Sequence, residues 1–571
     1  MSATPDSVAR RWASLVLVRR GRPLAALVLA LLAILLATTE PRPVERLRHA
    51  GFDAYQRLLP REREKAPAII VAIDEKSLAQ HGQWPWPRTL LARLIERIHA
   101  GGPYAIGLDL IFPEPDRLSA GLIAESLPGL DAQDVARLKA LPSNDTVLAK
   151  SIASVPTVLG VAGYDRSQLP ASAHRHPGFA PARQRGGDAI AFVGGQDVAL
   201  ANLPELERAA AGHALLSAEL ESGRARRVPL ISRVGDTLAP SLSLELIRVT
   251  ARRPAFDVQV GPHGVEAVGV EDIAARTQPD GRIWVHFARH DPSRFVSAAD
   301  VLSGEADAAL FREQMVIVGV TGLAITDQVT TPLDDRISGV EVHANVLENI
   351  FDGRVLHRPY WAAWAEALAL LAAGAALIVV MPASRMFLWP VLMAVLFAAL
   401  LGSGFAAYRY GQYLFDAAMP TLGVGAVFVV MMAALFAEGL MQRRLLRQRL
   451  QQEREAKARL AGELDAARRI QMGILPQAWN AFPGETRFSV SADLEPAREV
   501  GGDLYDFFML DPDRLFFLIG DVSGKGLPAS MFMAVSKALC KSISARYPAS
   551  VTETLREASR DIGRENPEQF F

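Results

Sequence analysis

The sequence contains a single cysteine, Cys540, and almost no excess of charge of either sign. One cysteine cannot form a disulfide within the chain, and it excludes a zinc site built from several thiolates. The 61 Lys and Arg residues stand against 62 Asp and Glu residues, which gives a net charge of −1. This balance excludes nucleic-acid binding driven by bulk electrostatics, and we expect no nucleic-acid partner.

Hydrophobic residues, in contrast, are abundant. They make up 50% of the 571 residues, and the mean hydropathy of +0.15 is high for a soluble protein. Such a composition indicates membrane-spanning segments. The length predicts roughly three or four structural units. We therefore expect a multidomain membrane protein.

The first candidate span covers residues 23–39, which carry no charge and are rich in Leu and Ala. Residues 1–22 contain five arginines, and positive charge favours the cytoplasmic side of the membrane. The alternative is a cleaved signal peptide, because spanning helices need roughly 17–25 residues and this segment is short. We favour an uncleaved anchor, since it gives the later spans a consistent topology.

Three further apolar segments lie at residues 361–381, 386–407 and 414–437, and an arginine-rich stretch follows the last of them. Four spans with a cytoplasmic N-terminus place residues 41–359 outside the membrane and the C-terminal part in the cytoplasm. Glu366 lies near the outer end of the second span. It is either an intramembrane functional residue or an interfacial one.

Residues 41–359 alternate strand and helix signals, which predicts an α/β domain with right-handed crossovers. Residues 89–100 have the periodicity of an amphipathic helix, whereas residues 117–150 are expected to form a long loop or insertion. Short apolar runs typical of buried parallel strands lie at residues 68–73, 105–108, 156–161 and 315–320.

Asp74 and Asp109 each follow one of these predicted strands. Open α/β sheets bind ligands at the carboxyl ends of their strands, so both residues are candidates for a ligand site. The alternative is that each carboxylate caps the turn or helix that follows.

Several motifs of this domain occur in a characteristic order, at residues 73–78 (IDEKSL), 84–88 (WPWPR), 107–112 (GLDLIF), 318–319 (VG), Asp327, 331–333 (TPL) and 339–345 (GVEVHAN). Together they resemble the CHASE2 extracytoplasmic sensor domain. The resemblance implies a multi-pass protein of the bacterial cell membrane, whose sensor receives an unknown external signal and precedes a cyclase, kinase or phosphatase module.

Residues 438–475 are predicted to form a charged helix between the membrane part and residues 476–571. Leu446, Leu450 and Leu460 share a heptad register, but only about half of the seam positions are apolar. This pattern predicts a weak parallel coiled coil in a homodimer, and the alternative is a solvated single helix. A coiled-coil seam that can switch between two packing arrangements would suit a helix that transmits a signal.

Residues 500–526 place the carboxylates of Asp503, Asp506 and Asp521 among glycines. Carboxylate oxygens beside a closely approaching backbone are what a hard divalent cation requires. A phosphate-binding P-loop is excluded, because Lys525 is followed by Gly526 instead of Ser or Thr. An EF-hand is excluded by the spacing. The alternative is that the aspartates only shape turns.

Residues 467–476, 500–507 and 520–526 resemble bacterial PP2C-like serine/threonine phosphatases of the SpoIIE or RsbU type. The resemblance implies metal ligation by Asp503, Asp521 and the backbone carbonyl of Val522. For Asp506 it implies either ligation or orientation of a metal-bound water. It further implies two Mn²⁺ or Mg²⁺ ions about 3.5–4 Å apart. The substrate would be a phosphoserine or phosphothreonine protein, such as an anti-sigma-factor antagonist.

This second resemblance covers residues 465–571, without the family's later aspartates. We therefore expect the N-terminal part of an α/β PP2C-like β-sandwich, with exposed apolar surface. We expect this chain alone neither to bind two metal ions tightly nor to turn over substrate. Two functions remain open: a membrane-bound sensor phosphatase, and a non-catalytic receptor or scaffold with a degenerate output domain.

Overall fold

The computed structural model describes residues 21–39, 41–168, 178–216, 223–322, 328–333, 335–477, 479, 481–496 and 499–566. The motif residue Asp327, the arginines before Gly21 and the last five residues lie outside these ranges. The chain divides into two compact units, Met1–Leu435 and Phe436–Phe571, which we call unit 1 and unit 2.

A mainly parallel sheet of seven strands forms the middle of unit 1. Its order is β15-β1-β16-β2-β3-β6, with β7 also paired to β3, and only the β3–β6 pair is antiparallel. The four apolar runs predicted as parallel strands form β1, β2, β3 and β16. The strands are β1 Ala68–Ile73, β2 Ala105–Leu108, β3 Thr157–Tyr164, β6 Val198–Leu200, β7 Gly212–Leu215, β15 Phe295–Ser297 and β16 Met315–Val320.

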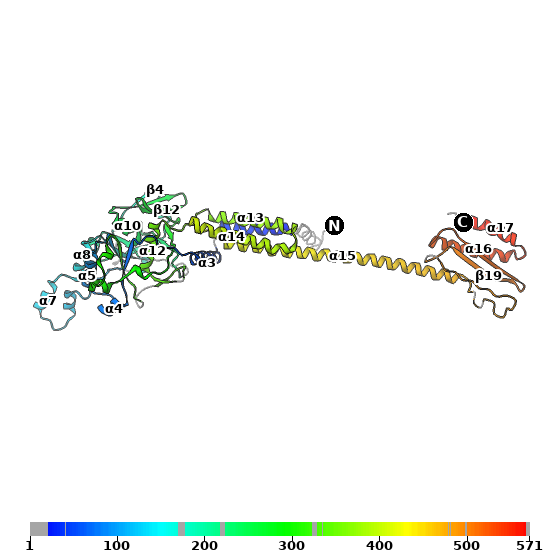
Figure 1. The fold of residues 1–571 in the computed structure, drawn as a ribbon, viewed down its shortest axis with the longest axis horizontal. Coiled ribbons are helices and arrows are strands. Elements are labelled where there is room, and N and C mark those ends of the chain that lie inside the picture. The colour runs from blue at the N-terminus through cyan, green and yellow to red at the C-terminus, as the bar shows by residue number, and fades with distance from the viewer. Residues whose placement is uncertain are drawn as a thin grey trace. The chain divides into compact units, whose positions relative to one another are not determined.

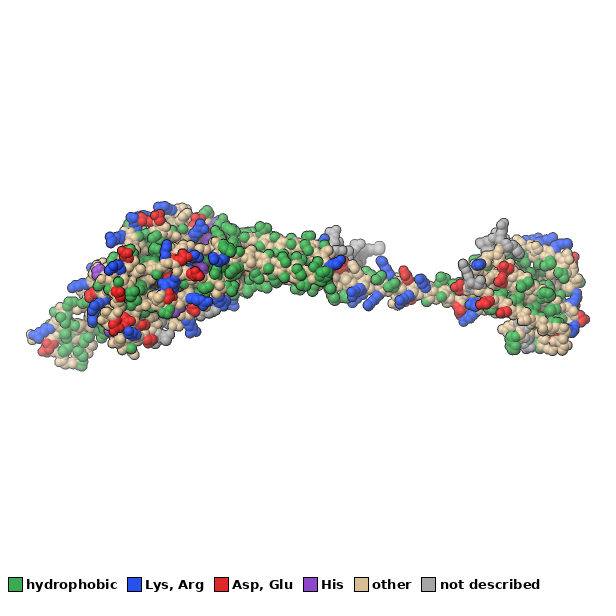
Figure 2. Space-filling view, viewed as in Figure 1, with side chains coloured by type: hydrophobic (Ala, Val, Ile, Leu, Met, Phe, Trp, Pro, Cys, Tyr) green, Lys and Arg blue, Asp and Glu red, His purple; other side chains and the backbone are tan. Residues whose placement is uncertain are grey.

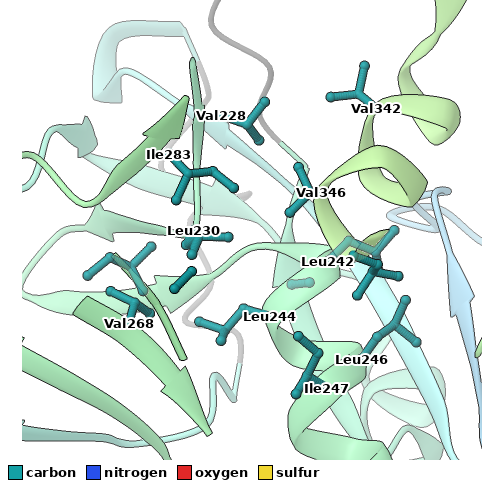
Figure 3. Packing of buried hydrophobic residues seen from close by; sticks show 14 of the residues in the cluster. Val228, Leu230, Leu242, Leu244, Leu246, Ile247, Val268, Ile283, Val342 and Val346 are labelled. Atoms are coloured by element: carbon teal, nitrogen blue, oxygen red, sulfur yellow. The ribbon is translucent and has the colours of Figure 1, made fainter. Parts of the chain in front are cut away.

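Helices cover both faces of this sheet, because its strands are apolar on both sides. Val71 and Val316 belong to one core with α5, α8 and α11, whereas Ile70 and Ile317 pack with α10 and α12. Figure 3 shows part of the second core. The helices are α4 Glu75–His81, α5 Arg88–His99, α8 Asn144–Ala153, α9 Pro204–Ala209, α10 Leu242–Thr250, α11 Ala298–Ser303 and α12 Gly339–Asp352.

Residues 117–150 were predicted as a long loop or insertion, and the long-loop alternative is wrong. They contain α6 (Ala120–Ser126), α7 (Ala132–Lys139) and the first part of α8. Asp131 and Ser143 accept hydrogen bonds from the main-chain N–H groups that begin α7 and α8. These caps stabilise short helices in a polar segment whose hydrophobic periodicity is weak.

A second, four-stranded sheet with the order β13-β12-β11-β4 packs on the α10 side of unit 1. Three smaller sheets pair β10-β9-β5, β14-β8 and β17-β18. The strands are β4 Ala182–Arg185, β5 Gly195–Gln196, β8 Arg227–Pro229, β9 Ile231–Val234, β10 Thr237–Pro240, β11 Phe256–Gly261, β12 Gly264–Val270, β13 Ile273–Arg276, β14 Arg282–Trp284, β17 Gln328–Thr330 and β18 Arg336–Ser338.

Apolar helices form a bundle in unit 1, and hydrophobic side chains cover its visible surface (Figure 2). Among the described residues, α13, α14 and α15 are long and apolar enough to cross a membrane. The first predicted span forms α2, which passes this test only together with α3, from which it is bent. Four spans were predicted, and the described residues contain three candidate spans, or four if α2 and α3 together form one span. The helices are α2 Arg22–Thr38, α3 Arg42–Leu58, α13 Ala362–Val380, α14 Trp389–Gly411 and α15 Ala418–Ile474.

Ion pairs tie the sheet domain of unit 1 to this bundle. Arg358 donates to both carboxylate oxygens of Glu366 on α13, at 2.6 and 3.1 Å, and to the carbonyl oxygen of Leu414 at 3.1 Å. The main-chain N–H of Asp416 also donates to Glu366, at 2.7 Å. Glu366 therefore holds together the end of the bundle next to the sheet domain, in a largely apolar segment that tolerates a charge only when it is paired.

Unit 2 contains the rest of α15, one β-hairpin and two helices (Figure 1). Most of the predicted span at 414–437 and nearly all of the predicted linker at 438–475 form a single continuous helix, α15. The hairpin is the one sheet in the described part of unit 2, so the expected β-sandwich is represented by two strands. Phe517 and Ile519 are 75% and 88% exposed, as expected for uncovered apolar surface. The elements are β19 Asp503–Asp511, β20 Arg514–Asp521, α16 Leu527–Arg546 and α17 Val551–Arg564.

Candidate functional site

The hairpin places Asp503 and Asp521 side by side at its open end. The two residues are direct partners in the antiparallel register of β19 and β20. Partial burial and the negative charge of Asp521 raise the pKa of Asp503. Two carboxylates that lie directly opposite each other on paired strands favour either a shared proton or a cation between them. The structure thus brings together the two predicted metal ligands.

Gly502 makes room for the backbone of Val522, whose carbonyl is the third predicted ligand. A Cβ on Gly502 would lie 2.4 Å from that carbonyl oxygen, which only a glycine avoids. The main-chain N–H of Val522 donates to the carbonyl oxygen of Gly502 at 3.3 Å. The glycine before β19 is therefore required for the close approach of the two strand ends.

Asp506 lies on the opposite face of β19 from Asp503, because residues three apart on a strand point to opposite sides. It is 1% exposed, and its carboxylate forms an ion pair with Lys537 on α16 at 3.1 Å. The structure does not bring Asp506 to the Asp503–Asp521 pair. Its observed role is to hold α16 against β19.

A cavity of about 490 Å³ adjoins the carboxylate pair and is also lined by Asp493 and Glu495. Sequence reasoning missed these two residues; their i, i+2 spacing, which puts them on one side of an extended chain, is the signal that could have found them. Within the described ranges, no group of three or more His, Cys, Asp or Glu side chains is placed to hold a metal ion. The pair and the Val522 carbonyl supply only part of a shell of six oxygen ligands.

Gln471, near the end of α15, holds the loop before β19. Its amide nitrogen donates to the carbonyl oxygen of Gly501 at 2.7 Å, and its amide oxygen accepts from the N–H of Gly501 at 3.1 Å. Tyr505 adds a hydrogen bond to the carbonyl oxygen of Pro476 at 3.1 Å. Gln471 falls in the same heptad register as Leu446, Leu450 and Leu460, which predicts a coiled-coil seam position, so its contact with the site loop was not predicted.

The two aspartates predicted for a ligand site in unit 1 have different surroundings. Asp74 caps α4, since its Oδ1 accepts from the N–H of Ser77 at 2.9 Å and from the Ser297 hydroxyl at 2.9 Å. Burial raises the pKa of Asp109, and His343 opposes this shift. Because β16 lies between β1 and β2, the two aspartates end strands that are not neighbours. For Asp74, the structure agrees with the helix-cap alternative.

Comparison with known proteins gives three findings. The CHASE2 domain family matches residues 26–381, and the Stage II sporulation protein E (SpoIIE) family matches residues 511–571, which include Asp521. Protein IcfG from Synechocystis sp. (strain ATCC 27184 / PCC 6803 / Kazusa) is 42% identical over 82 residues, 14% of this chain and 12% of that protein. The chain thus spans about an eighth of that relative. No solved structure matches.

The CHASE2 match covers more than half of the 571 residues and includes the parallel sheet and the helices α2 and α13. The chain is a signalling protein in which a CHASE2 sensor domain and apolar helices precede a SpoIIE-family segment. It belongs to the CHASE2 domain family.

Proposed function

We propose that this chain is a membrane-bound, signal-transducing protein serine/threonine phosphatase. Unit 1 would sense a signal outside the cell membrane, and unit 2 would act on a phosphoprotein in the cytoplasm. The observation that carries the proposal is the pairing of Asp503 with Asp521 beside an acidic cavity. A phosphorylated anti-sigma-factor antagonist is the substrate class that the family resemblance implies.

The residues present fit a divalent cation, because two carboxylates and a carbonyl oxygen are the donors that Mn²⁺ or Mg²⁺ prefers. Asp503, Asp521 and the Val522 carbonyl would hold it. A metal bound there supplies an acidified water and neutralises charge on the phosphoryl group. In the reaction, water oxygen bonds to phosphorus, the bond from phosphorus to the Ser or Thr oxygen breaks, and that oxygen takes up a proton.

Metal binding is the first test. Purified full chain is titrated with Mn²⁺ and followed by electron paramagnetic resonance. We expect D503N and D521N each to weaken binding about tenfold or more, because each removes a charged ligand. D513N, which changes an exposed aspartate at the turn of the same hairpin, is the matched control. Equal affinity of all four proteins would contradict the proposed site.

Phosphate release from a phosphoserine protein is the second test, run on the full chain with and without Mn²⁺. Mn²⁺-dependent release that D521N abolishes supports the phosphatase. Mn²⁺ binding without release favours the second candidate, a non-catalytic receptor or scaffold. The incomplete ligand set among the described residues is the observation behind that candidate.

A further inference from the structure

A cavity of about 420 Å³ lies in unit 1 between the four-stranded sheet and the segment that leads into α13. Its walls include Arg276 and Thr277 from the end of β13, and His357, Arg358 and Tyr360 from that segment. The ring of His263 packs against that of Tyr360 at a tilt, with 4.2 Å between ring centroids, and both residues line the cavity. The volume suits a small molecule or a lipid headgroup.

The walls carry two guanidinium groups. Arg276 is exposed, and no carboxylate in the described part of the chain forms an ion pair with it. Arg358 already binds Glu366 through two nitrogens. Glu266 is the carboxylate on these walls, and it accepts a hydrogen bond from Gln259 at 3.4 Å. Arg276 therefore offers an uncompensated planar donor to an anion entering the cavity.

His357 adds a second unsatisfied donor or acceptor. Its Nδ1 is buried and has no hydrogen-bond partner. Burial lowers the pKa of His357, and the charge of Arg276 lowers it further, which favours the neutral imidazole. His357 and Arg276 line the same cavity. Buried polar atoms without a partner are uncommon in folded proteins, so Nδ1 marks His357 as a side chain with unused hydrogen-bonding capacity.

We propose that this cavity binds an oxyanion of the phosphate class, with Arg276 as the main charged contact and His357 as a hydrogen-bonding partner. Guanidinium groups recognise phosphate oxygens through paired N–H donors. The same chemistry is presented by a phospholipid headgroup at the membrane surface and by a soluble phosphate compound, and the experiment below distinguishes these sources.

The wall formed by His357 and Arg358 also contacts the bundle. The N–H of His357 donates to the carbonyl oxygen of Gln412, and its carbonyl oxygen accepts from the N–H of Leu414, both at 2.9 Å. Arg358 holds Glu366 on α13. A ligand in the cavity would therefore contact the segment that joins α13 and the α14–α15 turn to the sheet domain. This inference rests on unit 1 being the sensor of the proposed function.

Binding is measured on detergent-solubilised full chain, by calorimetry with inorganic phosphate and by native mass spectrometry with phosphatidylglycerol. The test variant is R276Q, which removes the charge without breaking an ion pair. The matched control is R183Q, an exposed arginine on β4 at the other edge of the same sheet. We expect R276Q to weaken saturable binding about tenfold and R183Q to leave it unchanged.

If R276Q weakens the binding of inorganic phosphate and R183Q does not, the ligand is a soluble phosphate compound. If the two variants differ in this way with phosphatidylglycerol alone, the ligand is a lipid headgroup. In the wild type, the responsible probe should also slow hydrogen exchange at residues 356–360. Absence of saturable binding with both probes, or equal binding by the wild type and both variants, overturns the proposal. Phosphatase activity is not used in this experiment, so a failure of the proposed enzyme function leaves its result unaffected.

Discussion

Buried charges in this protein are held by partners of opposite sign. Arg294 is fully buried, and it donates to Glu341 at 3.0 Å and to Glu348 at 2.8 Å on α12. Arg61 joins the same group through Glu348 and Asp352. Removing one partner of such a group would leave an uncompensated buried charge, which typically costs about 3–5 kcal/mol. This network fixes α12 against the segment before β1.

His286 is buried beside this network in its neutral form. Its Nε2 lies 3.2 Å from the carbonyl oxygen of Leu59 and 2.9 Å from the hydroxyl of Tyr408, whereas its Nδ1 is buried without a partner. A second proton on the ring would have no acceptor. Burial, together with the charges of Arg61 and Arg354, lowers the pKa of His286 from 6.5 to about 4.

We expect acidification from pH 7 to pH 5 to destabilise unit 1 partly through His286. Because the folded-state pKa is depressed, the unfolded chain binds the proton more tightly, and stability present above pH 6.5 is lost as pH falls toward 4. The expected loss by pH 5 is about 2 kcal/mol. Thermal unfolding of the wild type and H286Q at both pH values measures it, and an equal loss in the two proteins would contradict the assignment.

Gln471 is the second residue with a specific prediction, because it binds both the N–H and the carbonyl of Gly501. Q471A should leave these backbone groups without their partner and cost about 1–3 kcal/mol locally. We expect faster hydrogen exchange at residues 500–502 and severalfold weaker Mn²⁺ binding. Q451A, which removes a glutamine whose amide donates to Glu455 on the exposed part of α15, is the control. Unchanged exchange at Gly501 in Q471A would be inconsistent with this role.

At the scale of the element, α15 joins an apolar half to a charged half without a break. In the charged half, Leu446, Leu450 and Leu460 are 59%, 48% and 58% exposed. Exposed leucines at heptad spacing on a long helix are typical of a coiled-coil seam. We therefore propose a homodimer through α15, in which Gln471 lies where the seam meets the site loop.

Disulfide trapping tests this homodimer. In a C540S background, single cysteines at Leu460 and Leu464 should cross-link on oxidation, because a parallel seam brings identical positions together. A cysteine at Gly462, on the opposite side of the helix, should not. Absence of cross-linking at both seam positions, or equal cross-linking at all three, would favour a solvated single helix.

At the scale of the whole molecule, apolar helices separate a CHASE2 domain from a SpoIIE-family segment along the chain. The N-terminal arginines and the arginines after the last apolar segment both favour a cytoplasmic location. We propose that both ends of the chain lie in the cytoplasm, which requires an even number of spans, so that α2 would cross the membrane as well as α13, α14 and α15. Whether α2 crosses thus decides on which side of the membrane the sheet domain lies.

Cysteine labelling of intact cells tests this topology. In the C540S background, a membrane-impermeant maleimide should label a cysteine at Ala153, at the exposed end of α8, and should not label one at Gly462. Both should react once the cells are permeabilised, which controls for accessibility. Labelling of G462C in intact cells, or protection of A153C, would require an odd number of spans or the reverse orientation.

Features that depend on a local pattern could be predicted from the sequence alone. Apolar runs located the parallel strands and the long apolar helices, because burial on both sides and contact with lipid each require uninterrupted hydrophobic stretches. The glycine-flanked aspartates marked Asp503 and Asp521, which the hairpin brings together. The caps of α7 and α8 are also local, but the polar composition of residues 117–150 concealed them.

The partner of each polar side chain, in contrast, is set by the packing of segments that lie far apart in the sequence. Asp506 resembles its neighbours in sequence, yet strand alternation turns it toward Lys537. Gln471 fits a heptad seam, but it binds Gly501, 30 residues away in the chain. Arg276 and His357 share a cavity although 80 positions separate them. Such contacts depend on how distant segments pack, and the period of a single segment carries no information about its neighbours in space.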